Sequence, residues 1–344
     1  MSDDRLRELE RAWRANPRDP EALAALEAAR RRAGLRAQPA PLDAELHPPR
    51  TFASAQRFDV FVQDAQGRVR GLGSSGRGQP PLELPEHRAW WVRPHPGSRG
   101  RALWTELREQ RIPGLSLERL RPSGQEWRAL GELDHLRWLS LADVRLTDRL
   151  IAEVGGLREL THLCLRRSVV GSPLGGLSDG QARTLARLPK LTHLDLAGSQ
   201  TLTRAGVAAF TTGASPLTAL DLSACPELDD GGLQALCGSA ELRRLSLGHN
   251  RRLGHRGLLQ LKELPRLSEL DLVGIARLDR GARRAFERLP LTRLALGQVA
   301  EHESPTGFVA SLPAEHLRHL HLEGTLDAAL PSPHSSASQP WRRS

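Results

Sequence analysis

The sequence predicts an α/β fold in which short parallel strands and helices alternate along a right-handed solenoid. The main observation is a pattern, Leu-x-x-Leu-x-Leu, whose nine copies follow one another at steps of 24, 24, 31, 26, 25, 25, 24 and 26 residues. A second observation is a helical pattern of apolar residues between successive copies. A regular period of this length is typical of a solenoid built from one supersecondary unit per repeat. The copies begin at Ile112, Leu136, Leu160, Leu191, Leu217, Leu242, Leu267, Leu291 and Leu317.

Each copy of the pattern predicts one short strand with two unlike faces. In Leu242-Arg-Arg-Leu245-Ser-Leu247, alternation along the strand places Leu245 and Leu247 on one face and Arg244 and Ser246 on the other. A single repeat cannot bury its leucines, whereas stacked repeats share a continuous core. We therefore expect the strands to line the concave side of the solenoid and the helices to cover its convex side.

The segments between the strands predict helices with polar caps. In Leu228-Asp-Asp-Gly-Gly-Leu-Gln-Ala-Leu236, Asp229 or Asp230 can accept hydrogen bonds from the free N–H groups of a first helical turn. The same order of a cap before an apolar stripe returns in Leu146-Thr147-Asp148 and in Leu177-Ser178-Asp179. Each repeat is therefore interpreted as strand, turn and helix.

The segment Leu220-Asp-Leu-Ser-Ala-Cys225-Pro-Glu-Leu-Asp-Asp-Gly-Gly-Leu233 resembles the cysteine-containing leucine-rich repeats best known from eukaryotic F-box adaptors. In that repeat type a Cys or Asn follows the strand. The resemblance covers roughly residues 111–327 and implies a leucine-rich repeat solenoid. This chain keeps a small or polar residue at the turn in most repeats and departs from it at Val144, Ile275 and Val299; the small or polar residues are Ser168, Ser199, Cys225, Asn250 and Thr325.

The regions that flank the repeats divide the rest of the chain into four parts. Residues 1–36 predict a helical hairpin that resembles a tetratricopeptide-type pair, and the proline-rich residues 37–50 predict a linker. Residues 51–110 predict a β-hairpin and an N-terminal cap of the solenoid, with a loose stretch from Gly71 to Pro81 and a helix from Arg99 to Arg108 that turns Trp104 inward. The tail at residues 328–344, rich in Ser and Pro, is expected to be disordered.

Composition gives an expectation about origin and compartment. Only Lys190 and Lys262 among the 49 basic residues are lysine, and the chain has no tyrosine. This avoidance of residues with AT-rich codons suggests a GC-rich bacterial genome, which accounts for an arginine-dominated net charge of +9 without nucleic-acid binding. No apolar stretch is long enough to cross a membrane, and no signal-peptide pattern is visible. With three cysteines in no paired spacing, we expect a cytoplasmic protein.

The concave face is expected to bind a protein partner. Its outward positions carry mixed charges and short side chains, with Trp138 as the single aromatic residue, and a basic stripe with interleaved aromatics is missing, which argues against nucleic acid. Trp138 is interpreted either as the centre of an interface or as a packing residue of the N-terminal cap. The candidate partner-binding residues are Trp138, His162, Arg166, His193, Asp195, Asp221, Arg244, Glu269 and Asp271.

Two alternative functions follow from the same residues. Neighbouring strands bring His162, Cys164, His193 and Asp195 together, and these are the ligand types of a zinc site and the parts of a thiol nucleophile. Their spacing is not diagnostic, so we expect neither an enzyme nor a bound metal or cofactor. The repeat resemblance also raises an adaptor role in ubiquitin transfer, which is disfavoured because residues 1–50 contain no recognisable F-box.

Overall fold

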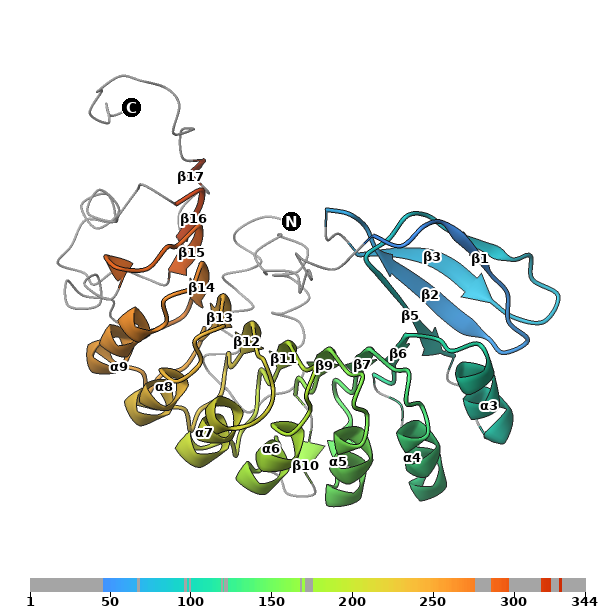
Figure 1. Ribbon diagram of the computed structural model, residues 1–344, viewed down its shortest axis with the longest axis horizontal. Helices are drawn as coiled ribbons and strands as arrows, with labels where there is room; N and C mark the ends of the chain where they lie inside the picture. Colours follow the sequence, from blue (N-terminus) through green and yellow to red (C-terminus); the bar gives the residue numbers. More distant parts are fainter. Residues whose placement is uncertain are drawn as a thin grey trace.

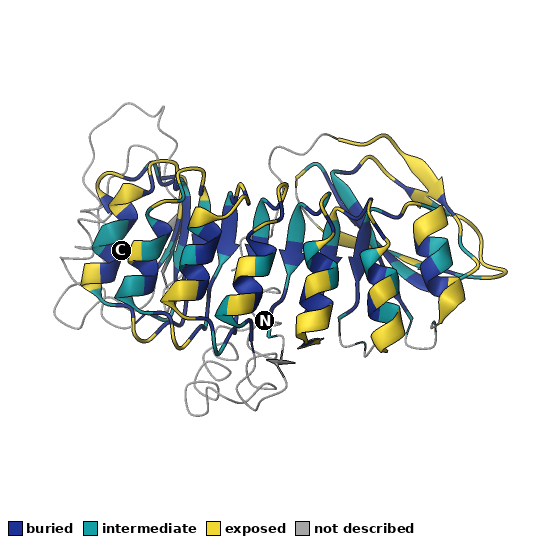
Figure 2. Ribbon diagram, turned by 60° about the horizontal axis from the view of Figure 1, so that its bottom comes forward, coloured by how far each residue is buried: buried dark blue, intermediate teal, exposed yellow. Residues whose placement is uncertain are grey.

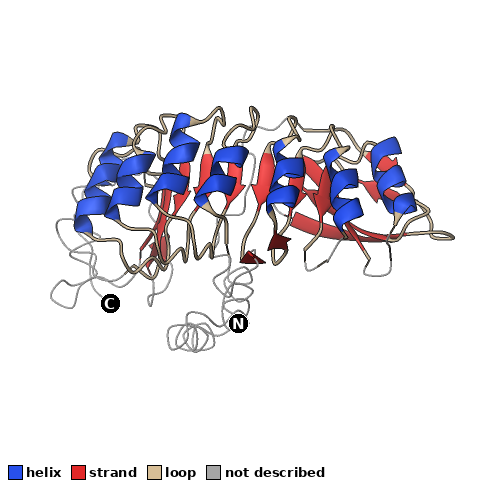
Figure 3. Ribbon diagram, turned by 90° about the horizontal axis from the view of Figure 1, so that it is seen from below, coloured by secondary structure: helices blue, strands red, loops and turns tan. Residues whose placement is uncertain are grey.

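The computed structural model describes residues 46–329, except for 67–68, 96–97, 99, 119, 121–122, 168, 171–175, 276–285, 297–316 and 323–327. The described repeats form an arc with the strands on its inner side and the helices on its outer side (Figure 1). This arrangement confirms the predicted α/β solenoid with a parallel sheet. Figure 3 shows the helices as a single layer over the sheet.

The inner strands pair in parallel, and each central leucine lies in register with the next. Leu115 pairs with Leu139, Leu139 with Leu163, and the series continues through Leu194, Leu220, Leu245, Leu270, Leu294 and Leu320. These leucines are buried. The strands are β6 (Gly114–Ser116), β7 (Trp138–Ser140), β9 (His162–Cys164), β11 (His193–Asp195), β12 (Ala219–Asp221), β13 (Arg244–Ser246), β14 (Glu269–Leu272), β15 (Arg293–Leu296) and β16 (His319–Leu322).

Three of the outer helices, at Thr147, Ser178 and Asp229, begin at caps that the sequence predicts. The Thr147 hydroxyl accepts a hydrogen bond from the N–H of Leu150, and the Asp229 carboxylate accepts one from Gly232. Ser178 forms a full capping box with Gln181. The elements are α3 (Arg101–Glu109), α4 (Gly124–Gly131), α5 (Asp148–Gly155), α6 (Asp179–Leu185), α7 (Arg204–Thr212), α8 (Asp230–Leu236), α9 (His255–Leu259) and the 3-10 helix η1 (Gln260–Glu263).

A single apolar core fills the space between the sheet and the helices, and Figure 2 shows buried residues along the inward sides of both layers. Polar turn residues complete this core. Asn250, which is fully buried, accepts a hydrogen bond from the Cys225 N–H at 2.8 Å and donates to the carbonyls of Leu222 and Leu247 at 2.9 and 2.7 Å. Its side chain therefore satisfies buried backbone groups of two adjacent repeats, which explains a polar residue at this turn.

The main sheet continues beyond the first repeat into an antiparallel segment. Strand β5 (Ala89–Pro94) pairs with β6 through Val92 and Leu115, and β2 (Phe58–Gln63) lies between β5 and β3 (Val69–Ser75). A smaller sheet joins β1 (Arg50–Phe52) to β4 (Leu82–Leu84). The expectation of a loose stretch from Gly71 is wrong as far as Ser75, because pairing with β2 extends the strand over these residues.

Other short elements lie at the edges of the repeats. Strands β8 (Arg145–Leu146) and β10 (Val169–Val170) form a separate parallel pair. Strand β17 (Ala328–Ala329) pairs with β16, so the expected disorder of the tail is wrong for these two residues. The predicted helical hairpin at 1–36, residues 37–45 of the predicted linker and the tail from residue 330 lie outside the described residues. Within the described chain, every helix is too short or too polar to cross a membrane.

The first prediction concerns the shared leucine strip. Replacing Leu245, which is 1% exposed, with Asp should lower the free energy of unfolding by more than about 3 kcal/mol, because the change buries an unpaired carboxylate. Denaturant unfolding followed by circular dichroism measures this. Arg243→Asp is the control, since Arg243 is an exposed neighbour on the same repeat. Equal stability of the two variants would contradict the inward direction of Leu245.

Candidate functional site

The outward side chains of the concave strands form rows that run across the repeats. Strand register places Phe61 beside Trp91, Trp138 beside His162, and His162 beside His193. A second row lies two residues further along the strands. In it, Asp195 on β11 is next to Asp221 on β12, and Asp271 on β14 follows two strands later. We call Phe61, Trp91, Trp138, His162 and His193 the aromatic ladder, and Asp195, Asp221 and Asp271 the carboxylate row.

Three rings of the aromatic ladder form a continuous stack. The ring centroids of Phe61 and Trp91 lie 5.8 Å apart, and those of Trp91 and Trp138 lie 4.7 Å apart. The expectation that Trp138 is the single aromatic residue of this face is therefore wrong, because β2 and β5 extend the sheet. Trp138 contacts the N-terminal segment, as one of its two interpretations proposed, yet it does so on the concave side rather than in the leucine core.

A glycine makes this stack possible. Gly114 lies on the strand between Trp91 and Trp138, so the two rings meet across an intervening strand. A Cβ atom at position 114 would lie 2.4 Å from the Trp91 Cβ and 2.6 Å from the Trp90 carbonyl oxygen. Any larger residue at Gly114 would therefore push β5 away from β6.

The two histidines form a second stack. The rings of His162 and His193 lie 4.1 Å apart and nearly parallel. The Thr161 hydroxyl donates to the Arg137 carbonyl at 2.8 Å and lies 2.8 Å from His162 Nδ1. The Arg137 carbonyl also accepts the backbone N–H groups of Thr161 and His162, at 2.8 and 3.0 Å. The proton of the neutral imidazole lies on Nδ1 when the Thr161 hydroxyl donates to the carbonyl, and on Nε2 when the hydroxyl donates to Nδ1. His162 Nε2 is buried without a hydrogen-bond partner among the described residues.

Burial also decides the charge of His162. Removal of the imidazole from water, with a smaller contribution from the nearby Arg244 guanidinium, lowers the pKa of His162 from 6.5 to about 4. His162 is therefore neutral at physiological pH. It is an uncharged hydrogen-bonding group and not a cation.

A buried arginine organises the carboxylate row. Arg166, 5% exposed, donates from Nε to Asp195 Oδ2 at 2.9 Å, and its terminal nitrogen also contacts Asp195 and lies 3.4 Å from Asp221 Oδ2. Burial, together with the neighbouring Asp195 carboxylate, raises the pKa of Asp221 from 3.8 to about 7. Arg166 thus holds two carboxylates in place and is itself too buried to contact a partner directly, which corrects its assignment as a partner-binding residue.

Backbone donors fix the same carboxylates from below. Oδ1 of each aspartate in the carboxylate row accepts the N–H two residues further on, at 3.0 Å for Asp195 and 2.9 Å for Asp221 and Asp271. Asp271 Oδ2 also accepts from the Ser246 hydroxyl at 3.2 Å. The remaining predicted residues, Arg244 and Glu269, form an ion pair with contacts of 2.9 and 3.2 Å.

The geometry does not assemble the alternative catalytic or metal site. Cys164 Sγ lies 3.6 Å from Asp195 Oδ2, and burial beside that carboxylate raises the pKa of the thiol well above 9.0. The thiol is therefore protonated and donates to Asp195, whereas a nucleophile or a zinc ligand requires the thiolate. Across the described parts of the chain, no group of three or more His, Cys, Asp or Glu side chains is placed to hold a metal ion.

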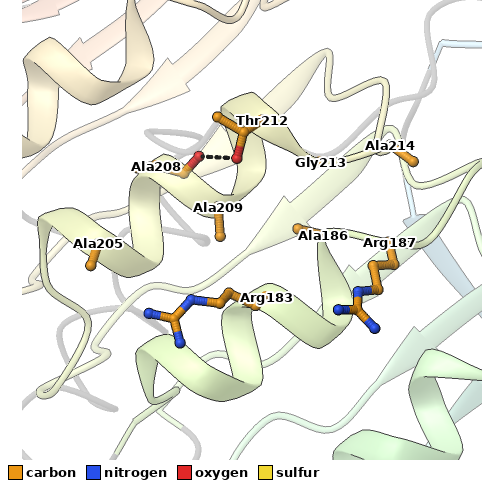
Figure 4. A pocket seen from close by; sticks show the side chains of 9 residues that line it. All are labelled: Arg183, Ala186, Arg187, Ala205, Ala208, Ala209, Thr212, Gly213 and Ala214. Carbon is orange, nitrogen blue, oxygen red and sulfur yellow. Dashed lines mark hydrogen bonds between the residues drawn. The ribbon is translucent and has the colours of Figure 1, made fainter.

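The sequence analysis did not predict a depression that lies on the convex face. It has a volume of about 480 Å³ and lies between α6 and α7, with small side chains on its floor and the Arg183 and Arg187 side chains along one side (Figure 4). The available signal was the set of small residues in and after α7, RAGVAAFTT followed by Gly213 and Ala214. Its lining consists of Arg183, Ala186, Arg187, Ala205, Ala208, Ala209, Thr212, Gly213 and Ala214.

One family model matches a repeat of this chain in sequence. Residues 214–237, which include β12 and α8, match the family model described as Leucine Rich repeat. An internalin (inlF) from Listeria monocytogenes is similar in structure, with a TM-score of 0.40, 18% identity and coverage of 61% of each chain. An internalin C2 (inlC2) of the same organism gives 0.36 and 20%, with 57% of this chain and 83% of that chain covered.

The match spans less than two thirds of the first internalin. No curated protein matches the sequence. The repeat at residues 214–237 is thus a leucine-rich repeat by its sequence match, and its strand β12 pairs in parallel register with β11 and β13.

A second prediction tests the role of Gly114. Gly114→Ala should lower the free energy of unfolding by about 1–3 kcal/mol, because the added methyl group meets Trp91 and the backbone of Trp90. Denaturant unfolding, with tryptophan fluorescence as one of its probes, measures the change. Gly124→Ala is the matched control, since its added Cβ would have no neighbour closer than 3.6 Å. A stable Gly114→Ala variant with wild-type fluorescence would contradict the close packing.

A third prediction concerns pH. The pKa of His162 falls from 6.5 to about 4 on folding, so the unfolded chain binds a proton at this residue at a higher pH than the folded chain does. The free energy of unfolding of the wild type should therefore decrease relative to that of His162→Gln as the pH falls from about 6.5 to about 4. Urea unfolding at several pH values gives the difference in unfolding free energy. A difference in unfolding free energy between the two proteins that stays constant over this pH range would refute the neutral state of His162. His319→Gln, at an exposed position, is the control.

Proposed function

We propose that this protein is an interaction scaffold that docks a protein partner on its concave face. The observation that carries the proposal is the ordered pair of rows on that face, the aromatic ladder and the carboxylate row. Large aromatic side chains beside fixed charges are typical of the energetic centre of protein interfaces. The rows stand on a rigid sheet, so little conformational entropy is lost when a partner binds.

The residues proposed to contact the partner differ in role. The Trp138 ring offers apolar area, and His162 and His193 extend it along the face. Asp195, Asp221, Glu269 and Asp271 supply charge, with Arg244 paired to Glu269. Arg166 acts as a positioning residue for the two carboxylates that it contacts.

A binding function is supported over a catalytic one by the state of the candidate groups. Cys164 is a protonated thiol, and His162 is neutral with one nitrogen committed to Thr161. We further propose a cytoplasmic location in a bacterium, based on three free cysteines and on the arginine-dominated composition.

A fourth prediction tests the concave face as the docking surface. The full chain is immobilised, partners are captured from a lysate of the source cells and identified by mass spectrometry, and the affinity of the captured partner is then measured. Trp138→Ala should weaken partner binding by more than about 1 kcal/mol, because an interface centre is lost, while the chain still folds. Arg187→Ala, on the convex depression, should bind like the wild type.

Two outcomes would overturn this function. Loss of partner binding in Arg187→Ala with none in Trp138→Ala would move the docking surface to the convex side. A Trp138→Ala variant with lower thermal stability and unchanged affinity would assign the ring to the N-terminal cap alone.

A further inference from the structure

We propose that the segment bound on the concave face is an extended, basic peptide of the partner, with one aromatic side chain that docks between Trp138 and His162. This inference rests on the proposed function and adds the chemistry of the partner to it. It is carried by an interruption in the aromatic ladder, by an unpartnered ring nitrogen and by the charge balance of the face.

The aromatic ladder is interrupted at one place. Neighbouring strands lie about 4.8 Å apart, so Trp91 and Trp138, with one strand between them, stack at 4.7 Å only because their rings lean together over Gly114. Trp138 and His162 lie on adjacent strands in register. Among the described residues, however, Trp138 stacks on Trp91 and His162 on His193, and no ring contact joins Trp138 to His162. Trp138 therefore leans away from His162 and keeps one ring face for a planar ligand group.

His162 offers an unpartnered ring nitrogen at the same place. Its Nδ1 contacts the Thr161 hydroxyl, and its buried Nε2 has no hydrogen-bond partner among the described residues. A buried polar atom without a hydrogen bond costs free energy that a ligand group recovers when it enters beside the ring. A peptide backbone carries both an N–H donor and a C=O acceptor, so it can pair with Nε2 in either tautomer.

The charges of the face favour the same ligand. On strands β6 to β14 and the turns directly after them, the outward carboxylates are Glu118, Asp195, Asp221, Glu269 and Asp271, whereas the outward guanidinium groups are Arg166 and Arg244. Both guanidinium groups are already engaged, Arg166 with two aspartates and Arg244 with Glu269. Strand β15 adds one outward guanidinium, Arg293, in register with Glu269. With it included, the outward carboxylates still outnumber the guanidinium groups, within a chain whose net charge is +9. The face would attract a basic segment and repel phosphate groups.

The strand spacing sets the spacing of side chains in the ligand. From Trp138 on β7 to Asp221 on β12 there are three steps between neighbouring strands, or about 14 Å, and to Asp271 on β14 there are five, or about 24 Å. An extended chain advances about 3.4 Å per residue. Side chains on one face of an extended chain recur at every second residue, so the matching peptide has an aromatic residue with basic residues about four and eight positions away. Residues 330–344 of this chain hold Trp341, Arg342 and Arg343 side by side and do not match that spacing.

A synthetic peptide tests the inference. The probe carries one tryptophan, arginines about four and eight positions after it, and Gly or Ser elsewhere, with the reversed sequence as a second probe because the direction of binding is open. Fluorescence anisotropy of the labelled probe with the full chain should give saturable binding that weakens as salt rises. Replacing the tryptophan with Ala, or the arginines with Gln, should each weaken binding at least tenfold.

Matched charge variants locate the surface. At about pH 8, above the pKa of Asp221, the double variant Asp221→Asn with Asp271→Asn keeps the side-chain oxygens that accept backbone N–H groups and removes two charges, and it should raise the Kd at least tenfold. The control, Glu227→Gln with Glu241→Gln, removes two charges outside the strands, from half-exposed ion pairs with Arg252 and Arg266, and should leave the Kd unchanged. His162→Gln should weaken binding by a smaller factor.

Several results would overturn the inference. They are an absence of saturable binding by either probe, equal effects of the two double variants, or tighter binding of single-stranded RNA than of the peptide. Tighter peptide binding after deletion of residues 330–344 would assign the surface to the chain's own tail instead of a partner. Failure of both probes while Trp138→Ala still weakens capture of a partner would reject the basic peptide and leave the scaffold function intact.

Discussion

Burial of the central leucine of each strand is the constraint on which the rest of the structure depends. That leucine is covered only when the next repeat lies beside it in register, because one strand and one helix enclose too little apolar volume. Leu245 is buried between Leu220 and Leu270 in this way. The same register aligns the outward side chains into rows, so the concave face is ordered as a consequence of the core.

The parallel sheet would end at β6 with exposed backbone and leucine edges, and the antiparallel segment covers that end. Strand β5 joins the two types of sheet through Val92 and Leu115. Because the sheet is continuous, the outward side of the cap becomes part of the concave face. Phe61 and Trp91 therefore contribute to a surface that otherwise consists of repeat positions.

Buried polar groups act as connectors between repeats. Asn250 joins the backbone of two turns, and Arg166 joins the carboxylates of two strands. Such groups are costly to bury unless they are paired. Here each is paired with the adjacent repeat, so their contacts favour one register of stacking over its alternatives. The resulting face carries fixed acceptors, which suits recognition of a ligand rich in donors.

The sequence by itself determined the repeat, its strands, its helix caps and its leucine core. These features are periodic and local, and the period of Leu245 and the cap at Asp229 can be read from neighbouring residues. It also placed His162 beside His193 and Asp195 beside Asp221, because parallel register follows from the repeat.

Only the tertiary structure decided what depends on contacts outside the period. Trp91 stacks on Trp138 because a cap strand joins the sheet and Gly114 leaves the space between them. Arg166 is buried between two carboxylates, and Cys164 is kept as a thiol, because burial and neighbouring charge set protonation and exposure. The repeat pattern in the sequence predicts which residue types face outward, but the burial and the contact partners of each side chain depend on packing in three dimensions.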